Sequence, residues 1–122
     1  MKPNKPQALF LAWQDYTSRV WFPIGRLTYD GTRYQFVYIK GAKDAEQQYG
    51  FQPLISFPQW DEIYYSNHLF PIFANRLMSP NRPEYPSFVE RLNVALDDDD
   101  PMVLLARSEG KRETDSLTVF PC

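Results

Sequence analysis

The sequence predicts an α+β fold: a small curved antiparallel sheet or partial barrel of about five strands with three to four short helices. Two observations lead to this prediction. Short apolar or alternating segments dominate the first half of the chain, whereas helical spacing and helix start signals are grouped in the second half. Proline is frequent, with 11 residues against 5 glycines, which favours short elements joined by stiff turns.

The first two expected strands lie near the N-terminus. Residues 8–14 (ALFLAWQ) form an apolar run typical of a buried strand. Residues 21–28 (WFPIGRLT) follow after a short turn. Pro23 inside this second segment indicates an edge position or a bulge, because proline cannot donate to a strand ladder. Gly25 marks either that irregularity or a close backbone approach.

A hairpin turn is predicted at Asp30-Gly31, since both residue types tolerate the positive φ that such turns require. Residues 33–39 (RYQFVYI) then alternate in the manner of a strand. One face of this strand carries Tyr34, Phe36 and Tyr38. The polar, alanine-rich residues 41–49 predict a short surface helix that ends at Gly50, a favourable residue after a helix C-terminus.

The middle of the chain is expected to contain a strand and then a helix. Residues 53–57 (PLISF) are short and apolar and lie between two prolines, which indicates a further strand. Apolar residues at helical spacing predict a helix over 69–78, capped by Ser66 or Asn67. Pro71 must then lie in the first turn of this helix, where its missing N–H does least harm.

The last third of the chain predicts two helices and a closing strand. One helix is expected over residues 86–93. Asp100 followed by Pro101 is a specific helix start signal, because aspartate caps a helix and proline suits its first position. This helix is expected to end at Gly110, and residues 116–120 (SLTVF) read as the last strand. The 122 residues fit one domain, 1–122, with a frayed N-terminus over 1–7.

Composition limits the class of protein. The formal net charge is −2 and no cluster of Lys and Arg stands out, so direct nucleic-acid binding is not expected. The single cysteine, Cys122, cannot form an internal disulfide, which favours a reducing compartment. No apolar stretch approaches the ~20 residues of a membrane helix, and the N-terminus does not resemble a signal peptide. A cytoplasmic protein without membrane contact is expected.

The sequence contains no convincing catalytic or metal-binding pattern. One histidine, His68, and one distant cysteine cannot supply the ligands of a zinc site. Ser66 lies close to His68 in the sequence, but no third group is placed to orient a catalytic pair, and a helix-entry role is the simpler interpretation. Glycine-rich phosphate-binding loops are absent. We therefore expect no catalytic residue, no cofactor, no metal and no enzymatic activity.

The aromatic residues, 16% of the chain, suggest where a partner could bind. Most of them recur at strand or helix spacing and are expected in the core; Trp13 and Trp21 are among these. Trp60 differs because it lies in a polar linker, FPQWDEIYYSN. It either packs over the edge of the core or contacts a partner protein. Tyr64 and Tyr65 share this linker, and Trp and Tyr are favoured interface anchors. The predicted partner-binding residues are Trp60, Tyr64 and Tyr65.

Six motifs, in order, resemble the N-terminal subdomain of HipA-type Ser/Thr kinases. They are PIGRLT, YQFVYI, PLISFP, SNHLFPIFANRL, DPMVLLARSEG and SLTVFP, and they span about residues 21–121. The matched positions are Ile24–Leu27, Phe36–Tyr38, Pro53–Pro58, Leu69–Leu77, Asp100–Gly110 and Leu117–Pro121. The chain departs from the pattern at two places. Arg76 stands where the family has an apolar residue, and residues 111–115 stand where the family has a glycine before the closing strand. The kinase core itself has no counterpart in the 122 residues.

The resemblance implies a regulatory role with two alternative partners. In three-component toxin–antitoxin systems of the HipBST type, a small HipS-like protein equivalent to this subdomain binds the kinase and restrains it. Alternatively, the opening "LFLAWQD…FPIGRL" and the segment "FANRLMSPNRPEYP" are similar to a domain that precedes HIRAN domains in bacterial proteins associated with DNA processing. The chain would then be a truncated relative or a single-domain offshoot of that group.

Overall fold

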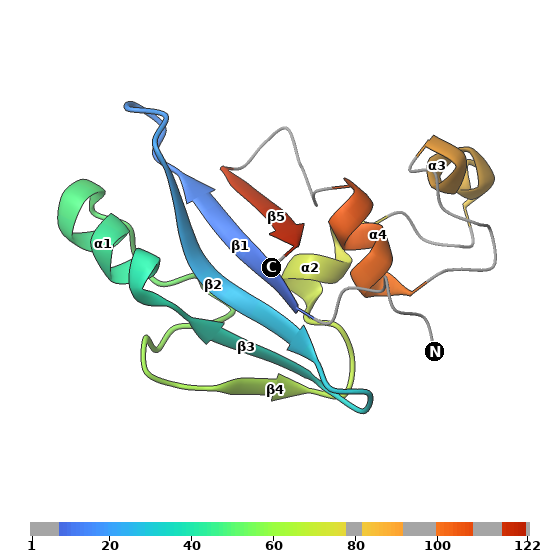
Figure 1. Cartoon of the computed structure of the whole chain (residues 1–122), viewed down its shortest axis with the longest axis horizontal. Helices are drawn as coiled ribbons and strands as arrows, with labels where there is room; N and C mark the ends of the chain where they lie inside the picture. Colours follow the sequence, from blue (N-terminus) through green and yellow to red (C-terminus); the bar gives the residue numbers. More distant parts are fainter. Residues whose placement is uncertain (1–7, 78–81, 92–99, 109–115, 122) are drawn as a thin grey trace.

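The computed structural model describes residues 8–77, 82–91, 100–108 and 116–121. In these residues a five-stranded antiparallel sheet is accompanied by four helices, so the predicted α+β class is confirmed (Figure 1). The strands are β1 (Ala8–Gln14), β2 (Trp21–Tyr29), β3 (Tyr34–Tyr38), β4 (Tyr64–Ser66) and β5 (Leu117–Pro121). The helices are α1 (Lys40–Tyr49), α2 (Pro71–Ala74), α3 (Tyr85–Arg91) and α4 (Pro101–Ser108). The strand order is β4-β3-β2-β1-β5, and the sheet is not closed into a barrel.

Strand β2 contains the irregularity that Pro23 predicts. In the pairing of β1 with β2, Leu11 lies opposite Gly25 and Ala12 lies opposite Pro23, which leaves Ile24 as the extra residue. This is a bulge, one of the two alternatives for Pro23. The other alternative, an edge position, is wrong because β2 lies between β1 and β3.

Two glycines allow close packing beside this bulge. A methyl group on Gly25 would overlap the ring of Phe36, which confirms the expected close approach. A methyl group on Gly41 would overlap the backbone carbonyl of Pro23, so α1 can lie directly against β2. Helix α1 ends as predicted at Gly50, which adopts the left-handed conformation with φ 73°.

The strand predicted over 53–57 is wrong. These residues form irregular backbone and a turn, with Ile55 fully exposed and Phe57 buried. The prolines at both ends of the segment cannot donate to a ladder, and its side chains do not alternate between two environments. The sheet gains β4 instead, within the linker, and β4 pairs with β3.

Helix α2 is shorter than the helix predicted over 69–78; residue 78 itself lies outside the described residues. Neither predicted cap is used. Phe70 occupies the N-cap position without a side-chain bond, while the Ser66 hydroxyl, at the end of β4, accepts a hydrogen bond from the His68 N–H at 3.2 Å. Pro71 lies in the first turn, as expected.

The start of α4 is confirmed by its capping contact. The Asp100 carboxylate accepts a hydrogen bond from the Met102 N–H at 2.9 Å, as an aspartate before a helix does. Helix α3 begins at Tyr85, one residue before the predicted start, and packs against α4 through contacts between Tyr85 and Leu104. The predicted ends at Asn93 and Gly110 lie outside the described residues.

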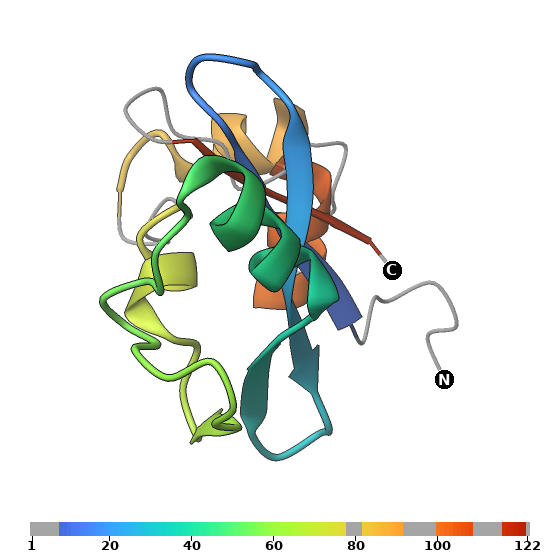
Figure 2. The ribbon, with the colours of Figure 1, turned by 90° about the vertical axis from the view of Figure 1, so that its left-hand side faces the viewer.

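The core lies on one face of the sheet, which we call the inner sheet face. The fully buried side chains of this face come from alternate positions of β1, β2, β3 and β5: Leu9, Leu11, Leu27, Phe36 and Val119. They join side chains of α1, α2, α4 and the segment after α1 in one apolar cluster. Figure 2 shows α1 and α2 on the same side of β2 and β3. Each such buried side chain contributes roughly 1.5–3 kcal/mol to stability.

No helix in the described ranges is long and apolar enough to cross a membrane.

Candidate partner-binding surface

Tyr64 and Tyr65, two of the predicted partner-binding residues, lie on opposite faces of the sheet. Consecutive side chains of a strand alternate between faces, so β4 directs only one of them towards the core. The ring of Tyr64 packs against Phe57 with centroids 5.0 Å apart. Its hydroxyl accepts a hydrogen bond from the Gln59 N–H at 2.7 Å. Tyr64 therefore fastens the loop that precedes β4.

Trp60 packs over the edge of the core, which is the first of its two alternatives. The indole is half-buried and meets Tyr38 edge-on with centroids 4.8 Å apart, and it lies 5.9 Å from the ring of Phe51. The ammonium of Lys43, on α1, lies 5.5 Å from the indole centroid. The indole therefore joins α1, the following loop and β3.

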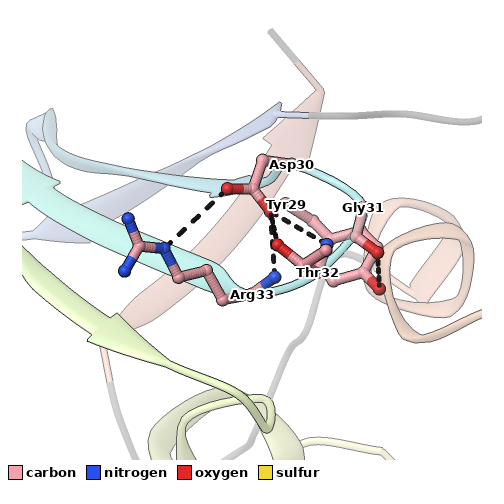
Figure 3. Close-up of polar contacts among 5 residues, drawn as sticks. All are labelled: Tyr29, Asp30, Gly31, Thr32 and Arg33. Carbon is pink, nitrogen blue, oxygen red and sulfur yellow. Dashed lines mark hydrogen bonds and ion pairs between the residues drawn. The ribbon is translucent and has the colours of Figure 1, made fainter.

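Tyr65 is exposed, and a cation lies over its ring. Its exposed fraction is 48%, and the guanidinium of Arg33 lies 4.0 Å from the ring centroid. The turn between β2 and β3 holds Arg33 in place (Figure 3). Asp30 accepts hydrogen bonds from the Arg33 N–H, the Thr32 N–H and the Thr32 hydroxyl, each at 2.9 Å. These donors, led by the Arg33 N–H, lower the pKa of Asp30 to about 2.

Tyr65 belongs to a larger surface on the face opposite the core. Residues directly opposite one another in paired strands point to the same face of the sheet, so the register of the strands identifies the other side chains of this face. We call it the outer sheet face and define it by Phe10, Trp21, Arg26, Gln35, Val37, Tyr65 and Phe120. The apolar members of this set, Phe10, Trp21, Val37, Tyr65 and Phe120, are not among the described side chains that form the buried cluster or pack against it.

The centre of the outer sheet face is a continuous row across four strands. Val37 lies opposite Arg26, Arg26 lies opposite Phe10, and Phe10 lies opposite Phe120. The rings of Phe10 and Phe120 contact each other with centroids 5.4 Å apart. Phe120 remains 37% exposed. The row thus presents an aromatic pair beside a single cation.

Trp21 extends this surface towards the β1–β2 hairpin, and its expected core position is wrong. Trp13 pairs with Phe22 and contacts the core, so the next pair in the register, Gln14 and Trp21, faces outward. Trp21 is 47% exposed. Side chains of β2 alternate between the two faces on each side of the bulge, and this alternation predicts an outward Trp21. It can be used only when the register of β2 against β1 is known.

The hairpin tip beside Trp21 is tied together by Asp15. Its carboxylate accepts a hydrogen bond from the Ser18 N–H at 2.7 Å, and this contact is the main reason that the pKa of Asp15 is lowered. Tyr16 at the tip is 81% exposed. The tip extends past the rest of the sheet at one end of the molecule (Figure 1).

The titratable residues of the described ranges do not gather into a metal site: no group of three or more His, Cys, Asp and Glu side chains is placed to hold a metal ion there. The side chain of His68 is exposed, before α2, which agrees with a helix-entry role.

Comparison with known proteins adds no relative: no family model matches the chain, and no curated protein or solved structure is significantly similar to it.

Proposed function

We propose that this chain is a non-catalytic protein-interaction and regulatory module that binds its partner through the outer sheet face. The observation that carries the proposal is the exposure of Trp21 and Phe120 on one face of the sheet, with the half-buried ring of Phe10 against Phe120, while the other face holds the buried core. Large exposed apolar side chains grouped on one face of a protein mark interaction surfaces. Tryptophan, tyrosine and arginine are also the residues that contribute most to protein interfaces.

The proposed partner is a HipA-type Ser/Thr kinase in the cytoplasm, which the module restrains as an antitoxin-like component. Support comes from the order of the six motifs over residues 21–121, which resembles the N-terminal subdomain of these kinases. A free-standing copy of a subdomain can dock where the tethered subdomain would lie, and an apolar surface is what such docking requires.

The experiment uses the purified chain and a HipA-type kinase whose reading frame neighbours that of this chain. Isothermal titration calorimetry measures complex formation, and transfer of labelled phosphate from ATP measures kinase activity with and without the module. We expect a one-to-one complex and a kinase activity that falls as the module is added. The chain alone should transfer no phosphate.

A kinase that neither binds the chain nor changes its activity would refute the proposed partner. Phosphate transfer by the chain alone would refute the non-catalytic role. Heat-unfolded chain serves as the control for unspecific effects of added protein on the kinase.

A second candidate function is that of an accessory domain in HIRAN-associated DNA processing or repair. The observation that favours it is the amino-acid sequence of two segments, around residues 9–27 and 73–86. Both are similar in sequence to the domain that precedes HIRAN domains. In this case the chain should bind a HIRAN-containing protein rather than the kinase. The same calorimetric titration, with the HIRAN-containing protein in place of the kinase, shows which of the two proteins the chain binds.

A further inference from the structure

Arg26 lies in the middle of the outer sheet face rather than at its rim. Its strand, β2, is the central strand of the sheet, with two strands on either side. On this face Arg26 is flanked by Val37 on β3 and by Phe10 on β1, and Phe120 lies beyond Phe10. The side chain of Arg26 is exposed. A cation is therefore framed by apolar side chains on both sides.

Arg26 differs in its partners from Arg33, the arginine that lies over the ring of Tyr65. Arg33 lies 3.9 Å from the Asp30 carboxylate and covers the ring of Tyr65, so its charge is already balanced. Arg26 makes no ion pair with any residue in the described ranges. Its guanidinium therefore keeps its hydrogen-bond donors for an external acceptor.

A partner that covers Phe10 and Phe120 must also cover Arg26, because the three lie side by side in one row. Removing water from an unpaired guanidinium opposes binding unless the partner supplies an acceptor of opposite charge. The planar guanidinium of Arg26 presents its N–H groups in a geometry that matches the two oxygens of a carboxylate.

We propose that the outer sheet face recognises a protein segment in which an acidic side chain, paired with Arg26, is flanked by apolar side chains that cover Phe10, Phe120 and Val37. This inference rests on the proposed role of the outer sheet face in partner binding. A carboxylate suits the site better than a nucleic acid, since the chain carries a net charge of −2 and a polyanion would meet overall repulsion.

The test uses three short synthetic peptides that are identical except at one central position. Each has alternating apolar and polar residues, and the central residue is Glu, Gln or Lys. Fluorescence anisotropy of a peptide label measures the dissociation constant for the full chain. We expect the Glu peptide to bind about tenfold more tightly than the Gln peptide, and the Lys peptide to bind most weakly. The preference should weaken as salt is added.

Two substitutions of the chain assign the preference to Arg26. Arg26→Gln should make the Glu and Gln peptides bind equally, and Arg26→Glu should reverse the order in favour of the Lys peptide. Arg107→Gln, which removes an exposed arginine on α4 outside the outer sheet face, is the matched control and should leave the preference for Glu unchanged.

Three results would overturn the inference: no peptide binds, the Glu preference persists in Arg26→Gln, or a single-stranded DNA oligonucleotide binds this face more tightly than the Glu peptide. Kinase binding that is unaffected by Arg26→Glu but lost with the aromatic residues would refute this inference alone. Peptide selectivity through Arg26 without kinase binding would refute only the proposed kinase partner.

Discussion

The indole of Trp60 meets the ring of Tyr38 edge-on, with centroids 4.8 Å apart and the planes at 69°. Edge-to-face pairs of this kind add to the stability that apolar burial gives. The pair connects the loop after α1 to the end of β3, and the Tyr38 hydroxyl extends the connection by donating a hydrogen bond to the Phe57 carbonyl at 2.6 Å. These contacts hold the loop against the inner sheet face.

Trp60→Ala should destabilise the protein without weakening partner binding directly. The indole packs against Tyr38 and Phe51, and its loss should lower the free energy of unfolding by roughly 2–4 kcal/mol, since the side chain is only half-buried. Urea unfolding followed by circular dichroism measures the change. Trp21→Ala is the matched control and should cost far less, because Trp21 is 47% exposed. Equal losses in the two variants would contradict the assignment of Trp60 to the core edge.

Tyr38→Phe should cost ~1–3 kcal/mol of unfolding free energy, because it leaves the Leu54 N–H and the Phe57 carbonyl without their partner. Thermal or urea unfolding detects this loss. The control is Tyr16→Phe, at the exposed hairpin tip, which should have no measurable effect. If both variants unfold like the original chain, the Tyr38 hydroxyl does not stabilise the loop.

The same hydroxyl predicts a fall in stability at alkaline pH. Burial raises the pKa of Tyr38 from 10.0 to about 12. The folded protein therefore holds this proton more tightly than the unfolded chain does, so the contribution is complete below pH 10 and is lost as the pH rises towards 12. The difference in unfolding free energy between the original chain and Tyr38→Phe should shrink over this interval. A difference that stays constant would contradict the burial of the hydroxyl.

The lowered pKa of Asp30 predicts that the stability of the fold decreases in acid. Hydrogen bonds from the Arg33 and Thr32 N–H groups and the Thr32 hydroxyl lower its pKa from 3.8 to about 2. Its contribution is therefore present above pH 3.8 and is lost as the pH falls through 2. Asp30→Ala should lower the melting temperature at neutral pH, and the gap should narrow in acid. Glu62→Ala, an exposed carboxylate outside the turn, is the control; an equal effect there would contradict the role of the turn.

Local signals in the sequence were enough to predict much of the fold. The Asp30-Gly31 turn, the alternation of 33–39 and the Asp100-Pro101 helix start each depend on a few neighbouring residues, and the structure confirms them. The errors over 53–57 and at Trp21 concern long-range pairing. Residues 53–57 are apolar enough for a strand, yet β3 pairs with β4 instead. The flanking prolines argue against a ladder at 53–57, but they do not indicate which segment takes its place.

The candidate surface was predicted only in part, for the same reason. Tyr65 is exposed, but its neighbour Tyr64 and the loop residue Trp60 pack inward. Which of two adjacent tyrosines faces outward depends on the register of β4 against β3, and a shift of one residue would exchange them. The Phe10–Phe120 pair joins the first and last strands, a contact that spacing along the chain does not predict.

The most direct test of the proposed function is the affinity of a HipA-type kinase for the double variant Trp21→Ser/Phe120→Ser. Both side chains are exposed, so the fold should persist, and the dissociation constant should rise about thirtyfold, corresponding to ~2 kcal/mol. Ile55→Ser, which removes a fully exposed apolar side chain outside the outer sheet face, should bind like the original chain. An unchanged affinity of the double variant, measured by the same titration, would contradict binding through this face.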